Sequence, residues 1–392
     1  MTAHPAGDPC GLRDPSLGVP TDDALGQAQE PDERRSRRWR SVLGWSATSV
    51  PVALLLVAGL VFGPRGLSLL SPAMLSLLNP VVPVALAALG VLVGLGVGDR
   101  RPDDRRVFAA AGLDAAVTML VVSAGIGVIG FAAMSSIVRP FWTLVLASGI
   151  CAATSLTLPT GNPLEPRTTA TRMIELGVLL PIVAGALLLA SLRAGSSLGA
   201  VALVAQASGV TLALAAAGWL LLTRVSSETE ERILAVSALL LVGGVADALS
   251  LSALFGGLVA GVFWRYAGRH PRATISRDVL FVQHPLLVLV LLVAGARVDL
   301  SLASLGLGAG YLVLRVVGRL AGGAVAGRVI GVNAPRDLRL SLLPPGVFGV
   351  AFALNAVSVV GADASILLAA VVAGTIGSEF VALLLPPRSV TE

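Results

Sequence analysis

The stretch that decides the fold is residues 341–357, SLLPPGVFGVAFALNAV, an apolar segment interrupted near its start by Pro344, Pro345 and Gly346. Proline lacks a backbone N–H and its ring clashes with the preceding turn, so a helix cannot run unbroken through this pair. Inside a bilayer, the backbone groups that such a break frees need a partner or a wet cavity. Proline kinks are common in membrane helices, so this stretch alone does not decide between a bend and a functional break.

A second interrupted segment, LASGICAATSLTLPTGNP at residues 146–163, carries Thr154 and Ser155 shortly before Pro159. The order of the apolar segments makes it cross the membrane in the direction opposite to residues 341–357. Two interrupted spans in corresponding but inverted positions are the sequence sign of an inverted-repeat secondary transporter, whose binding site lies where they cross. The two breaks together predict inverted repeats with two discontinuous crossing helices.

The composition places the chain among membrane proteins. Of its 392 residues, 55% are hydrophobic and 13% are charged, against about 25% charged in soluble domains, and the mean hydropathy is +0.86. We predict an all-α integral membrane protein with about 12 transmembrane helices of roughly 20 residues each. The predicted spans are residues 46–63, 80–98, 107–130, 140–160, 171–193, 199–223, 232–249, 251–265, 278–296, 301–330, 340–360 and 363–386.

Residues 1–42 differ from the rest, because they are rich in Pro, Gly and Asp and contain a basic run from Arg34 to Arg40. We predict a disordered cytoplasmic tail there, a transmembrane domain at residues 43–387 and a short cytoplasmic C-terminus at residues 388–392. Most loop arginines lie inside if the N-terminus is cytoplasmic, as the positive-inside rule requires. The outer loops then carry only Arg65, Arg139, Arg193 and Arg297. The prediction is a multi-pass protein of the cell membrane with both termini in the cytoplasm.

The ionisable residues argue against several classes of function. All 28 basic residues are arginine, so no amine is available for Schiff-base or lysine general-base chemistry. The cysteines and histidines show no disulfide framework or metal-ligand spacing, and no GxSxG, HExxH or paired-Asp motif is present. The net charge of +5 comes from arginines in tails and loops beside apolar spans. We predict no enzyme, no metal or cofactor and no nucleic-acid partner, while His284 could titrate near neutrality and sense cytoplasmic pH.

Two arginines lie inside the apolar segment LGLGAGYLVLRVVGRLAGGAVAG, residues 305–327. Arg315 is near its middle, and Arg319 follows one helical turn later on the same face. A charge at the centre of a bilayer costs about 2.5–3.5 kcal/mol on insertion scales, so it marks a pathway or a buried ion pair. Either arginine could act as a fixed charge beside a transported ion. Alternatively, Arg315 could bind the carbonyls of a broken helix, and Arg319 could reach towards the inner surface.

Several motifs occur in an order that resembles one known family. AGLVFGPRGLSLL (58–70) resembles an AGxxxGPxGL pattern, VALAALGVLVGLGVGDRR (84–101) resembles the next helix, and LASGICAATSLTLP (146–159) resembles a broken helix of small residues. DALSLSALFGGLVAGV (247–262) and VLVLLVAGARVDLSL (288–302) follow in the same order. Together they resemble the cation/proton antiporters of the monovalent cation:proton antiporter-2 type, relatives of the sodium/hydrogen exchangers and potassium-efflux antiporters.

The resemblance implies exchange of a monovalent cation, Na⁺ or K⁺, for protons by alternating access, in a homodimer embedded in membrane lipid. The chain departs from the family at the acidic motif that carries the ion. This motif would fall on Pro181 and Ile182, in RMIELGVLLPIVAGALL (172–188), and neither side chain can carry a proton or bind an ion. By the same resemblance, the basic residue opposite the motif maps to Arg315, or less well to Arg319. The arginine is therefore present without its expected acid.

The candidate ion-binding residues follow from what remains. Asp114 lies about two turns into its span and is the best replacement partner for Arg315. Thr154 and Ser155 lie at one break, and Asn355 follows the other. If Asp114 pairs with Arg315, cation exchange survives in altered form. If Arg315 has no acid partner, the core favours an anion or a small organic acid, or the protein has lost transport and serves as a sensor or assembly partner.

Three further residues are secondary candidates. Arg319 lies one turn beyond the central arginine. Glu175 lies nearer the inner surface, where it can also pair with Arg172. Glu379 lies about two turns from the inner end of the last span, where it could meet Arg319 or Arg328.

Overall fold

A computed structural model provides the structure, and the regular elements of the residues it describes are all helices. The predicted tail at residues 1–42, His284 and the C-terminus at residues 388–392 lie outside the described residues. The described residues are 52–97, 104–133, 139–155, 169–224, 227–249, 252–267, 282, 285–299, 301–331, 338–361 and 364–384.

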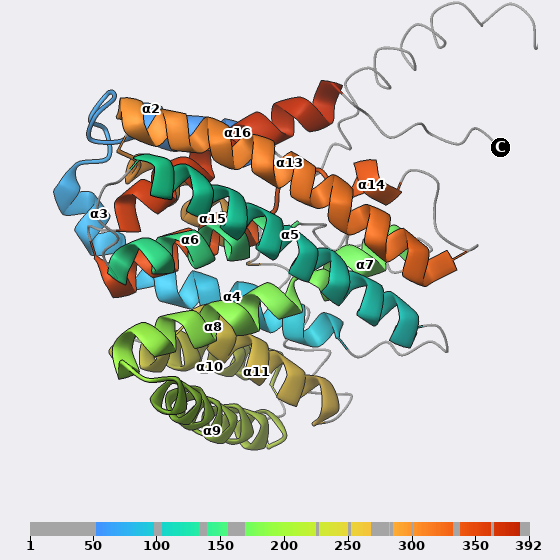
Figure 1. The fold of residues 1–392 in the computed structure, drawn as a ribbon. Coiled ribbons are helices and arrows are strands. Elements are labelled where there is room, and N and C mark those ends of the chain that lie inside the picture. Colours follow the sequence, from blue (N-terminus) through green and yellow to red (C-terminus); the bar gives the residue numbers. More distant parts are fainter. Residues whose placement is uncertain are drawn as a thin grey trace, which may run out of the picture. The chain divides into compact units, whose positions relative to one another are not determined.

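The helices keep the labels of Figure 1, and a further helix spans Pro285–Ala296. The labelled helices are, in chain order, α2 (Val52–Phe62), α3 (Pro72–Leu78), α4 (Val81–Gly96), α5 (Asp104–Ala133), α6 (Arg139–Ala152), α7 (Thr169–Gly177), α8 (Leu179–Ala194), α9 (Ser197–Leu222), α10 (Glu228–Ala248), α11 (Ala253–Tyr266), α13 (Leu302–Ile330), α14 (Leu338–Ser341), α15 (Val347–Val360) and α16 (Ser365–Leu384).

A helix lies in every predicted span, and several are long and apolar enough to cross a membrane. By length and composition, five helices of the described residues qualify, and the pair α3 and α4, bent by 45°, would make a sixth. Five further apolar helices are shorter, α6 and α15 among them. The predicted spans on either side of Ser250 are indeed two helices, α10 and α11. The chain is thus an all-α, multi-pass membrane protein.

The predicted break in residues 341–357 occurs where the sequence places it, while the part of the other predicted break beyond Ser155 lies outside the described residues. Residues 341–357 divide into the short α14, which ends at Ser341, and α15, which begins at Val347. On the other segment, α6 ends at Ala152, well before the predicted span end. A third interruption separates α7 from α8 at Val178. The helix can restart there because Pro181 falls in the first turn of α8, where a backbone N–H has no intrahelical partner to lose.

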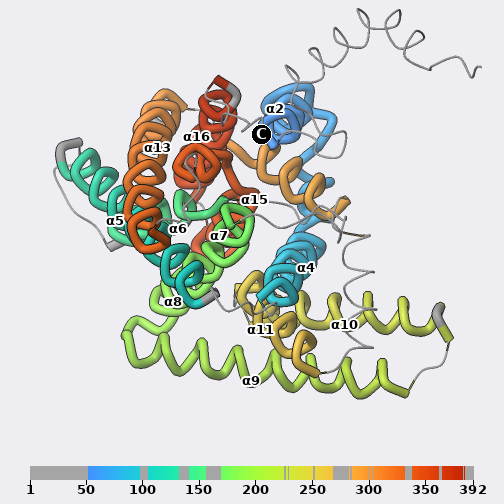
Figure 2. Tube along the Cα trace, turned by 90° about the vertical axis from the view of Figure 1, so that its right-hand side faces the viewer, coloured from blue at the N-terminus to red at the C-terminus, as the bar shows by residue number. Residues whose placement is uncertain are grey.

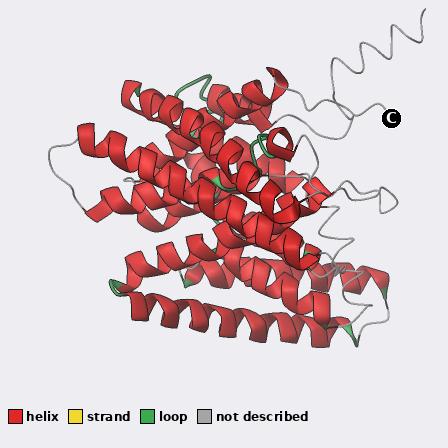
Figure 3. Ribbon diagram, turned by 45° about the vertical axis from the view of Figure 1, so that its right-hand side comes forward, coloured by secondary structure: helices red, strands yellow, loops and turns green. Residues whose placement is uncertain are grey.

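The interrupted helices lie next to each other. α6 packs against α15, α5 and α8, while α13 packs against α5 and α16. Figure 1 and the turned view in Figure 2 place α6 and α15 beside the long pair α5 and α13. Helices α4, α9, α10 and α11 form a second packed group, and α8 joins it to the first because α8 packs against both α9 and α6. Figure 3 shows that the regular elements around these groups are helices. The two breaks therefore meet against α13, the helix that carries both arginines.

Within the second group, α4 and α11 pack through facing small residues. Gly90 and Gly94 of α4 lie against Gly257 and Gly261 of α11. A Cβ added to Gly257 would lie 1.9 Å from a carbonyl oxygen of α4, and one added to Gly90 would lie 2.1 Å from a carbonyl oxygen of α11. Small residues four apart allow helix backbones to approach closely in membranes. This spacing leaves no room for any side chain at the crossing.

The start of α2 is capped from the other end of the chain. The Ala53 N–H donates to the Glu379 carboxylate of α16 at 2.5 Å. The first N–H groups of a helix have no intrahelical acceptor, and an anion there is favoured by the helix dipole. The prediction that Glu379 meets Arg319 or Arg328 is wrong, because its carboxylate binds this helix N-terminus.

Candidate functional site

Arg315 lies where α6 ends and the backbone approaches α15. Its Nη1 donates to the Ala152 carbonyl at 2.8 Å, and its Nη2 donates to the carbonyls of Thr154 at 3.1 Å and Pro344 at 3.4 Å. The residue is only 2% exposed. The last carbonyls of a helix lack intrahelical partners and carry partial negative charge. A buried guanidinium at this place therefore donates hydrogen bonds to these carbonyls and also offsets their charge. The guanidinium joins the two breaks directly.

Arg319, one turn further on, forms the buried ion pair of the site. Its Nη1 donates to Asp114 Oδ2 at 2.7 Å, and its Nη2 donates to the Ser155 hydroxyl at 3.1 Å. Arg319 is 1% exposed and Asp114 is 2% exposed. The prediction that Asp114 is the partner of Arg315 is therefore wrong, and so is the alternative that Arg319 reaches towards the inner surface. The helix α13 presents one arginine to backbone carbonyls and the next to the carboxylate.

Asp114 retains one oxygen that no protein group satisfies. Its Oδ1 is buried and has no hydrogen-bond partner among the described residues. One turn along α5, the buried Thr118 hydroxyl donates to the Gly318 carbonyl of α13 at 3.2 Å. A buried carboxylate oxygen without a donor is costly, so it is the group in this core that a cation or a proton would satisfy. Sequence reasoning did not identify Thr118, although its spacing from Asp114 is one helical turn.

The close contact between α5 and α13 requires Gly322. A Cβ at this position would lie 2.4 Å from Asp114 Oδ1 and 2.7 Å from the Asp114 backbone oxygen. We expect Gly322→Ala to separate the two helices and to lower stability by about 1–3 kcal/mol, the usual cost of overpacking. The measurement is the thermal unfolding midpoint of the purified protein in detergent.

Gly327 on the same helix is the matched control, because a Cβ there meets nothing within 4 Å. Gly327→Ala should leave the midpoint unchanged or raise it, since alanine favours a helix over glycine by about 1 kcal/mol. Equal midpoints for Gly322→Ala and Gly327→Ala would contradict the close approach.

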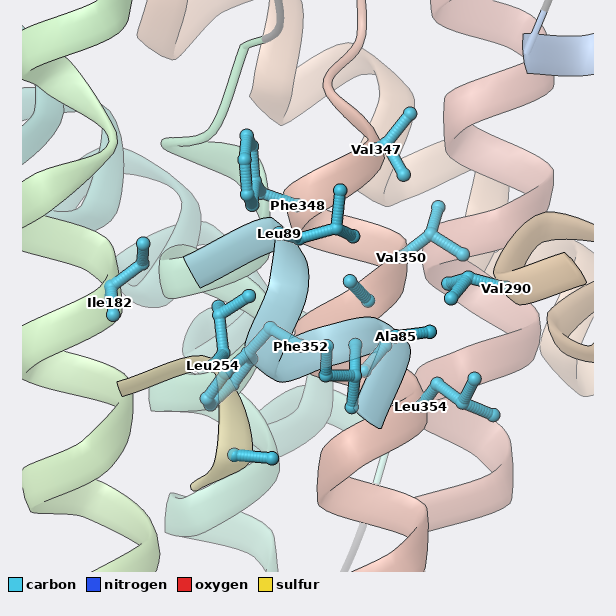
Figure 4. Close-up of a cluster of buried hydrophobic side chains, with 14 of the residues drawn as sticks. Ala85, Leu89, Ile182, Leu254, Val290, Val347, Phe348, Val350, Phe352 and Leu354 are labelled. Carbon is cyan, nitrogen blue, oxygen red and sulfur yellow. The ribbon is translucent and has the colours of Figure 1, made fainter. Parts of the chain in front are cut away.

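The position of the missing acidic motif is filled by apolar packing. Ile182 of α8 is 2% exposed and belongs to the main core cluster, which also contains Leu254 and Phe352. Figure 4 shows these side chains around α4, α8, α11 and α15. An Asp introduced at position 182 would face apolar neighbours and lose hydration without a partner. The arrangement around Ile182 is that of a packed core and offers no ligand to an ion.

The other predicted residues divide between the site and its surroundings. The Thr154 hydroxyl donates to the Cys151 carbonyl at 2.8 Å, so only its backbone oxygen reaches Arg315. Asn355 donates to the Ser252 hydroxyl at 3.2 Å and joins α15 to the start of α11. No hydrogen bond in the described residues joins Asn355 to the arginines.

Glu175 lies half-buried on α7, next to a smaller apolar cluster. Met173 and Ile174, its neighbours in sequence, pack in this cluster with residues at one end of α5, α13 and α14. The structure thus gathers Arg315, Arg319, Asp114 and the backbone at Thr154 and Ser155, while Glu175 belongs to the periphery.

Comparisons with known proteins identify the fold of the chain but not a family. No family model matches the chain, and no curated protein matches it. Among solved structures, it is similar to the sodium proton antiporter MjNhaP1 from Methanocaldococcus jannaschii, determined at pH 8, with a TM-score of 0.61 and 17% sequence identity. The match covers 89% of this chain and 94% of that chain. The predicted fold class, an all-α membrane protein with a sodium/proton antiporter-like fold, is confirmed.

Proposed function

We propose that this protein is a secondary transporter that exchanges a monovalent cation for protons by alternating access, with Asp114 as the carboxylate that cation and proton share. The observation that carries the proposal is the unsatisfied Oδ1 of Asp114, a buried oxygen of α5 that lies against Gly322 of α13. Intramembrane carboxylates that face a bundle interior are typical of ion and proton pathways. The similarity in fold to a sodium proton antiporter supports the same class of function and makes Na⁺ the first ion to test.

The proposed exchange uses Arg319 as a fixed counter-charge. Arginine keeps its proton at any physiological pH, so the proton that moves is the one on Asp114. While Asp114 is ionised and empty, Arg319 neutralises it. When Asp114 takes a proton or a cation, Arg319 still has the Ser155 hydroxyl as an acceptor. Through Arg319, the protonation or ion binding of Asp114 thus affects the hydrogen bond to Ser155, just beyond the end of α6. We expect α6 to change between the inward-facing and outward-facing states.

The alternative of an anion or a small organic acid bound by Arg315 has less support. Both terminal nitrogens of this guanidinium already donate to backbone carbonyls. An anion would have to displace those acceptors and leave the carbonyls of the break without partners. The finer predictions, namely a cytoplasmic N-terminus and C-terminus, a homodimer and a choice between Na⁺ and K⁺, stay predictions.

The test is reconstitution into proteoliposomes under an imposed pH gradient, followed by addition of Na⁺, K⁺ or Li⁺ in turn. A pH-sensitive dye reports dissipation of the gradient. We expect at least one cation to dissipate the gradient with the unaltered chain. Asp114→Asn should abolish the response, because the amide can neither release a proton nor supply a negative charge.

Asp299→Asn is the matched control. Asp299 is an exposed carboxylate that pairs with Arg65 outside the site, so its replacement should cost at most about 1 kcal/mol of stability and leave the exchange rate essentially unchanged. No cation-driven dissipation by a folded, reconstituted chain would refute the exchange function and favour a non-transporting homologue. Full activity in Asp114→Asn would refute the role of Asp114.

A further inference from the structure

The space beside Gly322 brings three oxygen atoms of α5 together. A Cβ built on Gly322 would lie 2.4 Å from Asp114 Oδ1, 2.7 Å from the Asp114 backbone oxygen and 3.1 Å from the Thr118 hydroxyl oxygen. Gly322, Asp114 and Thr118 are all buried. Three oxygens from one turn of α5 therefore converge on a buried place that glycine leaves without a side chain.

These oxygens have lone pairs to offer and no proton to donate there. Asp114 Oδ1 is buried without a hydrogen-bond partner among the described residues. The Thr118 hydroxyl donates its single proton to the Gly318 carbonyl at 3.2 Å, and a hydroxyl oxygen keeps two lone pairs when it donates. The Asp114 carbonyl lies inside α5, where a helical hydrogen bond uses one of its two lone pairs. The place therefore suits a cation and not an anion.

The charge and the spacing narrow the kind of cation. Asp114 supplies one negative charge, and Arg319 already pairs with it at 2.7 Å, so a divalent ion would leave excess positive charge buried. A distance of 2.4 Å is too short for carbon beside oxygen, but hard cations such as Ca²⁺ keep about 2.3–2.6 Å from oxygen ligands. Na⁺ is close to Ca²⁺ in size, Li⁺ is smaller and K⁺ is larger. The spacing thus favours a small monovalent cation.

We propose that the cation exchanged at Asp114 is a small one, Na⁺ or Li⁺, bound between Asp114 Oδ1 and the Thr118 hydroxyl oxygen, and that Gly322 limits its size. The ion would lie beside the position of the added Cβ and not on it, because that position is one bond from Gly322 Cα. Thr118 and Gly322 would thus determine the affinity and the size of the ion in the exchange proposed above, on which this assignment rests.

The experiment measures cation binding to the purified full chain in neutral detergent at fixed pH. NaCl, LiCl or KCl replaces choline chloride at constant ionic strength, and the rise of the thermal unfolding midpoint with concentration gives the affinity. We expect Na⁺ and Li⁺ to raise the midpoint at concentrations about tenfold or more below those of K⁺, because selectivity follows the size of the site.

Variants of Thr118 test the second ligand. Thr118→Val keeps the shape of the side chain without its hydroxyl, so it should weaken Na⁺ binding about tenfold or more, the usual effect of losing a polar contact to a charge. Thr118→Ser keeps the hydroxyl and should bind Na⁺ within about threefold of the unaltered chain. A purely structural role of Thr118 would lower the midpoint in choline chloride and leave its dependence on Na⁺ unchanged.

Thr211→Val is the matched control, because Thr211 is also a buried threonine but lies on α9. It should leave Na⁺ affinity unchanged, and Thr118→Ala repeats the test if Thr118→Val does not fold. Equal affinity for Na⁺ and K⁺, or unchanged Na⁺ affinity without the Thr118 hydroxyl, would refute the assignment while leaving exchange at Asp114 intact. Thr118-dependent binding of Na⁺ without any exchange in proteoliposomes would instead support these ligands and refute the exchange function.

Discussion

Replacing Arg315 with alanine is expected to cause the largest loss of stability of any single substitution among the arginines that the structure describes. The change leaves three backbone carbonyls without their donor at the meeting point of α6 and the α14–α15 break. Each buried acceptor left unsatisfied costs about 1–3 kcal/mol, so three of them give a total loss of about 3–9 kcal/mol. Exchange activity should disappear as well, because the break that is meant to move loses its fixed geometry.

Thermal unfolding in detergent and the proteoliposome assay measure these two effects. Arg315→Lys should recover only part of the stability, because a single ammonium group cannot reproduce the planar fork of donors that reaches three carbonyls. Arg328→Ala on the same helix is the matched control, since Arg328 is exposed. If Arg315→Ala has the same unfolding midpoint and the same exchange rate as the unaltered chain, the hydrogen bonds from Arg315 to the carbonyls do not contribute to stability or transport.

The second large effect concerns the pair of Asp114 and Arg319. Removing one partner leaves the other buried without compensation, which typically costs about 3–5 kcal/mol. We therefore expect Asp114→Leu and Arg319→Met each to lower the unfolding free energy by this amount. The double variant should lose much less, because apolar residues of similar volume can replace a buried pair with little or no loss. Unfolding midpoints of the four proteins give the coupling energy directly.

This cycle also separates folding from function. The double variant keeps a packed core but has no carboxylate, so it should unfold near the unaltered midpoint and show no exchange. Additive losses in the double variant would contradict the ion pair. Exchange by the well-folded double variant would contradict the role of Asp114 without affecting the description of the fold.

The positions of the helices could be predicted because the features that determine them are local in the amino-acid sequence. Apolar runs of sufficient length fix a helix wherever the chain meets lipid, and the prolines at 344 and 345 stop one regardless of its surroundings. The sequence also identifies Arg315 as unusual, since a charge in such a run has few explanations. For the same reason, Asp114 could be selected as a carboxylate that pairs with an arginine of this helix, although the sequence assigned it to Arg315 instead of Arg319.

The partners of these charges could not be predicted, because they depend on how helices rotate against one another. Arg315 and Arg319 share a helix face, and only the packing of α13 on α5 decides which of them reaches Asp114. Arg315 binds backbone carbonyls 161 and 163 residues away in sequence. Because every residue has a backbone carbonyl, the amino-acid sequence does not indicate which carbonyls a buried arginine will bind. Gly322 is one of several small residues in this segment, so the sequence does not distinguish it. Its role depends on the close contact between α13 and α5, which only the structure shows.

The cap on α2 has a consequence for biosynthesis. Its acceptor, Glu379, lies 326 residues after Ala53, so the ribosome makes the first described helix long before the carboxylate that completes it. Until α16 is made, the Ala53 N–H lacks the carboxylate acceptor that it has in the folded chain. Insertion of α16, the last described helix, therefore supplies the acceptor that caps α2, the first described helix. A chain truncated before α16 would therefore lack the carboxylate cap on α2.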